Sequence, residues 1–155
     1  AYTMMGWIRQ APNPADGQAV FYRGNTGKVA NQLGVNIKNA QVYHAMSVGS
    51  SNSSFQEGFS EARADVGQWH HIAVAREAAV VSFYIDGAPA GTLAVSADDF
   101  AATDYPLYIG INCDKDGNVY AKNAFNGAMD DLRLYDTAIS AEEIAAIVFY
   151  FQHFV

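Results

Sequence analysis

The fold of this chain depends most on the stretch Gly127-Ala128-Met129-Asp130-Asp131-Leu132-Arg133-Leu134-Tyr135. Alternate residues of a strand face opposite sides of a sheet, so the stretch predicts a strand with Leu132 and Leu134 on one face and Asp131 and Arg133 on the other. Asp130 would share the face of the two leucines. A carboxylate that points inward needs hydrogen-bond donors, a cation or a metal. The stretch therefore predicts a strand that carries one inward carboxylate.

A helix and an apolar tail are expected after that strand. Ser140 and Glu143 stand at capping-box spacing, which predicts a helix from Ala141. Residues 148–155 then form a strongly apolar tail, Val-Phe-Tyr-Phe-Gln-His-Phe-Val. Three conformations fit this tail: a strand that folds back onto the domain, a strand inserted into a neighbouring subunit, or a continued helix packed on the domain.

Short strands separated by turn residues fill most of the remaining chain. Strands are predicted over residues 2–9, 19–23, 32–37, 41–48, 69–76, 79–86, 92–95 and 105–112. Residues 47–58, rich in Ser, Gly and Asn, are expected to form a loop. Asp86-Gly87 is a tight-turn signal because glycine tolerates a positive φ. Many short strands, closely spaced turns and one terminal helix favour an antiparallel sandwich.

Four motifs resemble those of bacterial laminin-G-like domains, within the concanavalin A-like lectin/glucanase and pentraxin group. The first is the closing strand with its helix cap, from Phe125 to Ile144. The other three, in the family's order, are Gly67-Gln68-Trp69-His70-His71, Phe83-Tyr84-Ile85-Asp86-Gly87 and Leu107-Tyr108-Ile109-Gly110. The resemblance covers one domain, residues 1–147. It implies an all-β fold, an antiparallel two-sheet jelly-roll sandwich with one short C-terminal helix.

The sequence departs from this family at its beginning. The family usually starts with one more strand, with a Phe-Asp-Gly-x-x-Asp-Tyr-type motif, which pairs beside the closing strand. Here the chain opens after that strand and without a signal peptide. An absent first strand would leave the closing strand with an unpaired edge, which is an association hazard.

Composition excludes some classes of partner. The 155 residues include 9 Lys and Arg against 16 Asp and Glu, a net charge of −7, which disfavours nucleic acid because its binders usually carry basic patches. No apolar run reaches the roughly 18 residues of a membrane span. Cys113 is the single cysteine, so no intrachain disulfide forms.

Asp130 is the first candidate metal ligand. The family resemblance implies a Ca²⁺ site near its position, shared with the strand that is missing here. The alternative is a buried carboxylate that accepts backbone N–H groups. The adjacent His70 and His71 form a weak metal pair, because neighbouring strand residues face apart.

A second candidate calcium site is the segment from Asp114 to Asn118. Asp114, Asp116 and Asn118 place oxygen ligands at alternate positions, as Ca²⁺ prefers. The EF-hand pattern then requires Gly and Glu where Val119 and Phe125 stand. A plain turn is therefore the favoured interpretation.

Aromatic residues on strands are the candidates for glycan contact. Tyrosines that alternate with apolar residues could form a platform for a sugar, and they are Tyr43, Tyr84, Tyr108 and Tyr120. The alternative is ordinary packing. Enzymes of the resembled group use carboxylates spaced Glu-x-Asp-x-x-Glu on one strand. The five glutamates show no such spacing; they are Glu57, Glu61, Glu77, Glu142 and Glu143.

These observations lead to three functional hypotheses. The first, carried by the resemblance, is a non-catalytic extracellular or cell-surface recognition and adhesion module that binds a glycan or a protein partner, linked to Ca²⁺. The second is a structural subunit of a surface fibre or particle, which self-associates through the open edge and the apolar tail. The third is a glycan-active enzyme whose residues the sequence does not reveal.

Overall fold

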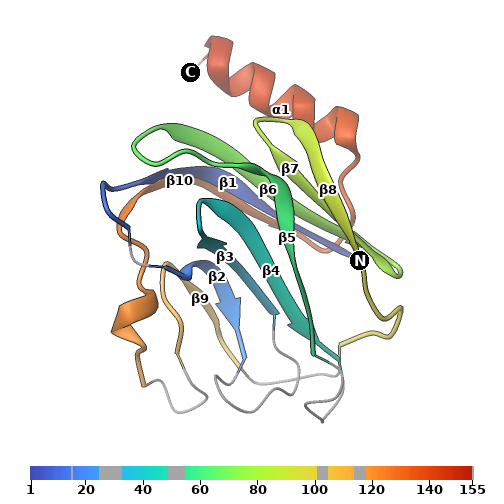
Figure 1. Ribbon diagram of the computed structural model, residues 1–155. Helices are drawn as coiled ribbons and strands as arrows, with labels where there is room; N and C mark the ends of the chain where they lie inside the picture. Colours follow the sequence, from blue (N-terminus) through green and yellow to red (C-terminus); the bar gives the residue numbers. More distant parts are fainter. Residues whose placement is uncertain (15, 25–32, 49–54, 101–104, 114–117, 155) are drawn as a thin grey trace.

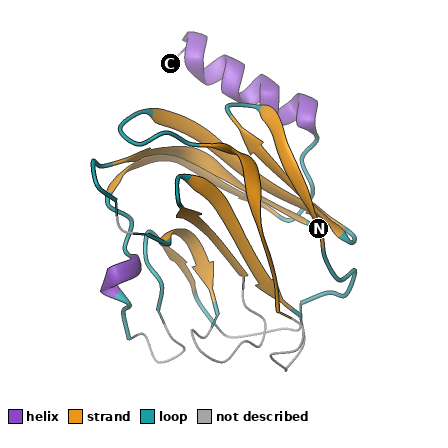
Figure 2. Ribbon diagram, viewed as in Figure 1, coloured by secondary structure: helices purple, strands orange, loops and turns teal. Residues whose placement is uncertain are grey.

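The computed structural model describes residues 1–14, 16–24, 33–48, 55–100, 105–113 and 118–154. The elements follow in the order β1 (Tyr2–Gln10), β2 (Gln18–Arg23), β3 (Leu33–Lys38), β4 (Gln41–Ser47), β5 (Phe55–Arg63), β6 (Trp69–Glu77), β7 (Val80–Ile85), β8 (Ala88–Ala94), β9 (Leu107–Ile109), the 3-10 helix η2 (Ala121–Asn123), β10 (Gly127–Tyr135) and α1 (Ala141–Phe154). Almost all of these elements are strands (Figure 2).

The strands form two antiparallel sheets that pack face to face (Figure 1). One sheet has the order β10-β1-β6-β7-β8, and α1 lies over its outer face, so we call it the helix-side sheet. The other has the order β5-β4-β3-β2-β9, and we call it the pocket-side sheet because a pocket lies on its outer face. The predicted fold class, an all-β antiparallel two-sheet jelly roll with one C-terminal helix, is confirmed.

The main core lies between the two sheets. Strand alternation turns every second side chain inward, as with Val42 and Met46 of β4 and Val81 and Phe83 of β7. All four are less than 1 % exposed. One polar bridge crosses this core, because the Tyr2 hydroxyl of β1 lies 2.8 Å from Nε2 of His44 in β4. Burial of apolar area on this scale is the main force that holds the sheets together.

Helix α1 makes a second, smaller core on the outer face of the helix-side sheet. Ile144 is fully buried there against residues that point away from the main core, namely Met5, Ala73, Ala75 and Tyr84. The predicted capping box is present: the Ser140 N–H donates to Glu143 Oε2 (3.0 Å), and the Glu143 N–H donates to Ser140 Oγ (3.2 Å).

The turn between β7 and β8 allows this close packing. Asp86 and Gly87 both have positive φ, 52° and 80°, as the sequence predicts for a tight hairpin turn. A Cβ at Gly87 would lie 3.1 Å from the Cα of Ala145 in α1. The hairpin tip therefore lies so close to the helix backbone that a side chain at Gly87 would crowd Ala145.

The expected orientation of Asp130 is wrong because β10 contains a bulge. Trp7 lies opposite Asp130 and Met5 opposite Arg133, so Gly6 alone faces the two residues between them. Asp131, one of the two, has φ 45°. The extra residue reverses the alternation, so Asp130 and Arg133 share the outer face. Leu132, which lies between them, still packs on the main core. Asp130 is exposed.

One further expectation is corrected, and one open alternative is decided. Residues 55–58, expected in a loop, begin β5, which continues to Arg63 as an edge strand with mostly exposed side chains. Of the three conformations that fit the apolar tail, the structure has the continued helix, because residues 148–154 belong to α1. In the described part of the chain β10 is an edge strand of its sheet, as expected for the closing strand.

Candidate functional site

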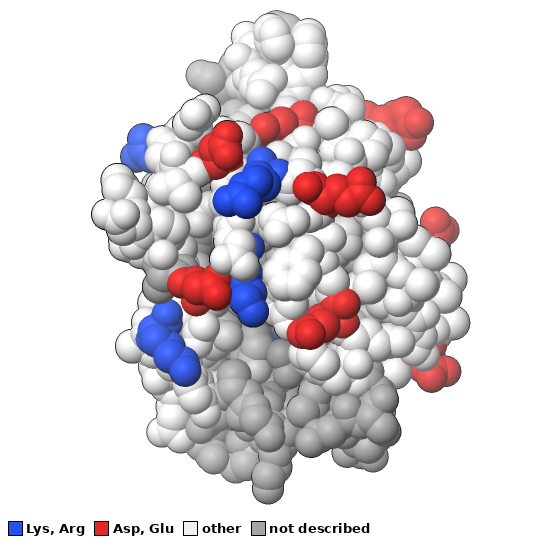
Figure 3. Space-filling view, viewed as in Figure 1, with Lys and Arg blue, Asp and Glu red and all other residues white. Residues whose placement is uncertain are grey.

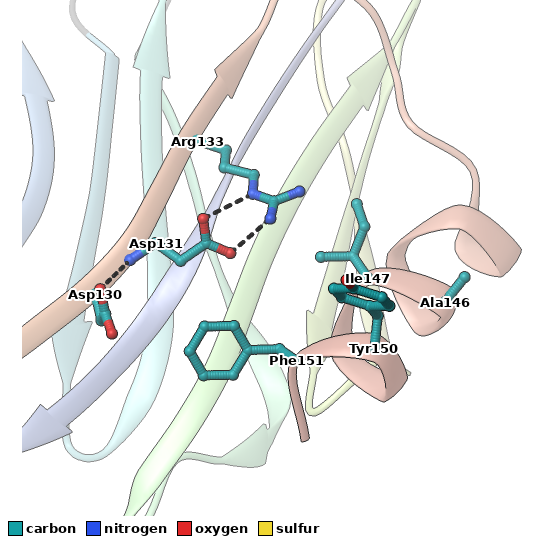
Figure 4. Close-up of a pocket in the computed structure, with 7 residues that line it drawn as sticks. All are labelled: Asp130, Asp131, Arg133, Ala146, Ile147, Tyr150 and Phe151. Carbon is teal, nitrogen blue, oxygen red and sulfur yellow. Dashed lines mark hydrogen bonds and ion pairs between the residues drawn. The ribbon is translucent and has the colours of Figure 1, made fainter. Parts of the chain in front are cut away.

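The outward carboxylates of β10 face α1 across a groove (Figure 4). Asp131 and Arg133 project from the strand, and Ile147, Tyr150 and Phe151 approach from the helix. The groove has a volume of about 570 Å³ and is open to solvent. The sequence therefore singled out the strand that borders this groove but placed Asp130 on the wrong face of it.

Two of the three described charged residues in this groove, Asp131 and Arg133, form an ion pair with each other. Arg133 donates from Nε to Asp131 Oδ1 (2.9 Å) and from Nη2 to Asp131 Oδ2 (2.7 Å), a two-bond geometry that fixes both side chains. The hydrogen bonds to Asp131 hold the pKa of Arg133 above its ordinary value. Among the described residues, Asp130 is left with one hydrogen bond, from the Asp131 N–H to its Oδ1 at 2.8 Å.

This arrangement does not fit a calcium site at Asp130. Ca²⁺ requires six to eight oxygen ligands, and both oxygens of Asp131 are bonded to Arg133. Among the described residues, no group of three His, Cys, Asp or Glu side chains is placed to hold a metal ion. Asp114 and Asp116 lie outside the described residues, and Asn118 is exposed. Calcium binding stays a prediction.

The four candidate tyrosines lie in different environments. Tyr84 is 9 % exposed and packs under α1 with Ile144, so burial removes it from any ligand platform. Tyr108 of β9 and Tyr120 near η2 are half-buried. Tyr43 of β4 is also half-buried, and it lines a pocket on the opposite side of the molecule from α1. Of the four, Tyr43 therefore has the surroundings that suit a ligand best.

We call that hollow the amide pocket. It has a volume of about 260 Å³, and polar side chains dominate its lining, which consists of Asp16, Gly17, Tyr22, Asn36, Lys38, Tyr43, Asn112 and Asn123. The outward residues of β2, β3 and β4 form its floor, because Tyr22 pairs with Gly34 and Asn36 pairs with Tyr43 across the sheet. The turn before β2 and the segment around η2 form its walls.

Hydrogen bonds fix the walls of the amide pocket. Asn123 donates from Nδ2 to the Gly17 carbonyl at 3.0 Å, which ties η2 to the turn before β2. Asp16 Oδ1 accepts the Asn39 N–H at 3.2 Å. The pocket is therefore held by contacts between segments more than 100 residues apart in sequence.

Tyr43 is held rigidly at the rim of this pocket. Its ring packs on Phe59 with centroids 4.9 Å apart, and the Lys38 ammonium lies 5.8 Å from its centroid. Its hydroxyl donates to the Glu57 carboxylate. Burial, together with this hydrogen bond, raises the pKa of Tyr43 above its ordinary value, so the hydroxyl stays protonated at neutral pH.

Three polar atoms of the amide pocket are buried and have no hydrogen-bond partner within the described structure. They are the hydroxyl of Tyr22 and the Oδ1 atoms of Asn36 and Asn112. Tyr22 is 1 % exposed and Asn36 is 6 % exposed. Burial also raises the pKa of Tyr22, so its hydroxyl remains a neutral donor and acceptor. Unpaired buried polar atoms are costly, and several in one pocket indicate a polar ligand or ordered water.

Most residues of the amide pocket carry no signal in the sequence. One signal was available, since Gly34, Asn36 and Lys38 alternate with apolar residues and so predict a polar outer face of β3. The asparagines at 112 and 123 carry no comparable pattern, because only the chain path brings them to this sheet. The location of Tyr22 in the same pocket also depends on strand pairing.

Charge is dispersed on the face of the molecule that Figure 3 presents. Acidic side chains are scattered there between uncharged ones, and the basic side chains lie among them. The described residues of that face form no extended basic surface of the kind that phosphate backbones require. In the described part of the chain, no helix has the length and hydropathy needed to cross a membrane.

Known proteins share this architecture. The carbohydrate-binding module CBM40 of the Ruminococcus gnavus IT-sialidase superposes with a TM-score of 0.73 at 17% identity, covering 95% of this chain and 82% of that one. Domain 4 of AbnA, a GH43 extracellular arabinanase from Geobacillus stearothermophilus, gives 0.71 at 17% identity (95% and 66%). A heptameric SAP-like pentraxin from Limulus polyphemus gives 0.71 at 16% identity (95% and 69%). Some of these domains belong to enzymes.

Sequence comparisons agree with the structural ones. The chain is 24% identical over 148 residues to adhesion G-protein coupled receptor V1 of Danio rerio, which covers 92% of this chain and 2% of that protein. The family model Laminin_G_3, described as the concanavalin A-like lectin/glucanases superfamily, matches residues 1–145. This chain therefore belongs to the concanavalin A-like lectin/glucanases superfamily.

Proposed function

We propose that this domain is a non-catalytic recognition module that holds one sugar residue of an extracellular or cell-surface glycan in the amide pocket. The observation that carries the proposal is the set of unpartnered buried atoms on Tyr22, Asn36 and Asn112. A sugar hydroxyl both donates and accepts hydrogen bonds, so it suits a phenolic hydroxyl next to amide oxygens. Tyr43 adds an aromatic rim.

The relatives support a glycan as the ligand. The CBM40 structures include complexes with α2,3- and α2,6-sialyllactose, and domain 4 of AbnA is in complex with arabinotriose. An adhesion receptor among the relatives supports an extracellular or surface setting. The non-catalytic assignment rests on the lining of the pocket, where Asp16 is the one carboxylate among the described lining residues. Glycoside hydrolysis usually requires two carboxyl groups across the scissile bond.

A glycan array followed by calorimetry tests this function, with arabinotriose and both sialyllactoses included as probes. Tyr22→Phe and Asn36→Leu each remove one polar contact and should weaken binding about fivefold to tenfold, the equivalent of one hydrogen bond. Tyr84→Phe, on the other sheet, is the matched control and should bind normally. An array without any bound glycan, or binding that neither pocket variant weakens, refutes the proposal.

Calcium is a separable part of this proposal. We infer from the family resemblance that glycan binding depends on Ca²⁺, although the described residues around Asp130 do not fit the ion. Calorimetry in EDTA and in added Ca²⁺ tests the dependence. Equal affinity in both buffers refutes the role of calcium and leaves glycan recognition standing.

Self-association is the second candidate function. Two large aromatic side chains of α1, Phe149 and Tyr150, are 57% and 62% exposed, and β10 is an edge strand in the described part of the chain. Exposed apolar side chains and strand edges favour contact with another copy. Light scattering at high concentration tests this: oligomers that Phe149→Ser dissociates support it, and a strict monomer contradicts it.

A further inference from the structure

A second hollow lies on the outer face of the helix-side sheet, beyond the point where α1 is packed down. We call it the tryptophan groove, and its volume is about 450 Å³. It is lined by one side chain from each of three adjacent strands and by two from the helix, namely Trp7, Trp69, Asp130, Phe151 and Gln152. It shares no lining residue with the amide pocket.

The sheet register brings these side chains together. Trp7 of β1 lies opposite Asp130 of β10 on one side and opposite His71 of β6 on the other. Trp69 follows on the same face of β6, directly opposite Arg9. The bulge in β10 is necessary here, because it turns Asp130 toward the helix side.

The aromatic part of the groove is rigid on one side and exposed on the other. Phe151 stacks on Trp7 with centroids 5.0 Å apart and an interplanar angle of 29°. Trp69, by contrast, keeps 40% of its surface exposed. The Arg9 guanidinium lies 5.2 Å from the Trp69 ring centroid and holds that ring in place.

The polar part offers donors and an acceptor that have few partners. Asp130 is exposed and has no ion pair among the described residues, and its one hydrogen bond is to the neighbouring N–H. The indole Nε1 of Trp7 is buried and has no acceptor among the described residues, in a side chain that is 5 % exposed. Gln152 adds an amide to the lining, and the Arg9 guanidinium lies beside Trp69 outside the lining.

The charges restrict the chemistry of the ligand. A cation over Trp69 would lie beside the Arg9 guanidinium, which is already near that ring, and an anion in the groove would lie beside Asp130. A neutral ligand that has an apolar face for the exposed Trp69 ring and hydroxyls for Asp130 and Gln152 suits this lining. We propose that the tryptophan groove is a second carbohydrate site, for a neutral pyranose residue.

Two sites on opposite outer faces would allow one domain to hold two glycan chains. Simultaneous engagement raises the effective affinity for a dense glycan surface without any new contact. This inference goes beyond the proposed function and does not depend on it, because the two hollows share no lining residue.

The chain contains two tryptophans, and both line this groove. The two indole N–H signals in a ¹H–¹⁵N correlation spectrum therefore report on the groove, while the amide pocket has no indole. We suggest titrating the protein with methyl glycosides of glucose, galactose, N-acetylglucosamine and xylose. At least one neutral glycoside should shift both indole signals.

Four variants complete the test. Trp69→Ala and Asp130→Asn should each weaken this binding at least tenfold. The indole signals that remain in each variant monitor the binding. Phe149→Ala, an exposed helix aromatic outside the groove, should leave it unchanged, and so should Tyr22→Phe in the amide pocket.

Three outcomes overturn the inference. In the first, none of the glycosides shifts an indole signal, or choline does so instead. In the second, Trp69→Ala and Asp130→Asn bind like the original chain. In the third, Tyr22→Phe abolishes the shifts, which would place the ligand in the amide pocket and leave the proposed function intact.

Discussion

The two outer faces of this sandwich arise from the same alternation of side chains along the strands, but one is covered by a helix and the other holds a pocket. On the helix-side sheet the outward residues near the centre are apolar, and Met5, Ala73 and Tyr84 are covered by α1. On the pocket-side sheet the outward residues of β3 include Asn36 and Lys38, which line a hollow. The contrast teaches that the composition of the outward residues decides whether a sheet face becomes a second core or a recognition surface.

The helix-side face should contribute most to stability, and Ile144→Ala should show it. Ile144 is 0% exposed at the centre of the second core, so its truncation should cost about 2–5 kcal/mol. Phe149→Ala, on the exposed side of α1, should stay within about 0.5 kcal/mol. Chemical denaturation measures both. Equal costs would mean that α1 does not pack on the sheet.

Each sheet also contains one buried histidine, which predicts acid sensitivity. Burial lowers the pKa of both His44 and His71 to about 4. The unfolded chain binds these protons below about pH 6.5, while the folded chain stays neutral until about pH 4, so stability is complete above pH 6.5 and falls as the pH drops toward 4. At pH 5 each histidine should cost about 2 kcal/mol.

Denaturation between pH 7.5 and 5 measures this loss, above the usual range of the carboxylates. His44→Asn and His71→Asn should each remove about half of the pH dependence, whatever their effect on stability at neutral pH. His153→Asn, an exposed control in α1, should keep all of it. An unchanged pH dependence in both buried variants would contradict the assignment.

The bulge that turns Asp130 outward should be sensitive to Gly6→Ala. An added Cβ would lie 2.5 Å from Leu132 Cδ2 and 3.1 Å from Leu132 Cα, so we expect a loss of about 1–3 kcal/mol. Leu132→Ala in the same chain should relieve part of the clash, and a double-mutant cycle measures the coupling. Strict additivity would argue against this bulge geometry.

The helix cap makes a smaller contribution on the same face. Ser140→Ala removes the acceptor of the Glu143 N–H and should cost about 1 kcal/mol. Ser140→Asp should restore most of the stability, because aspartate is also a favoured N-cap residue. Thermal unfolding compares the two, and equal destabilisation by both would rule out a capping role.

The smallest effect is expected on the pocket-side face. Tyr22→Phe removes a buried hydroxyl that has no partner among the described residues, so the free energy of unfolding should not fall and should rise by up to about 1 kcal/mol. Tyr2→Phe removes the hydroxyl bonded to His44 and should cost about 1 kcal/mol. If Tyr22→Phe costs as much as Tyr2→Phe, the Tyr22 hydroxyl has a structural partner.

Some elements could be predicted because their signals are local. The hairpin at Asp86-Gly87 and the helix cap at Ser140 depend on residues within four positions of one another, and both are confirmed. Strand β5 was missed because it is an edge strand with mostly exposed side chains, and its sequence resembles a loop. The prediction that the Asp130 carboxylate points inward was wrong, because side chains alternate strictly along a strand only where the strand has no bulge.

The sequence by itself determined the two-sheet architecture, the start of α1 and the family. Side-chain alternation, turn residues and a capping box act over short distances and need no knowledge of the partner strands. Only the tertiary structure decided which way Asp130 faces, that the apolar tail continues the helix, and that Tyr22, Asn36 and Asn112 meet in one pocket. These features depend on strand register and on contacts between distant segments, which local patterns do not encode.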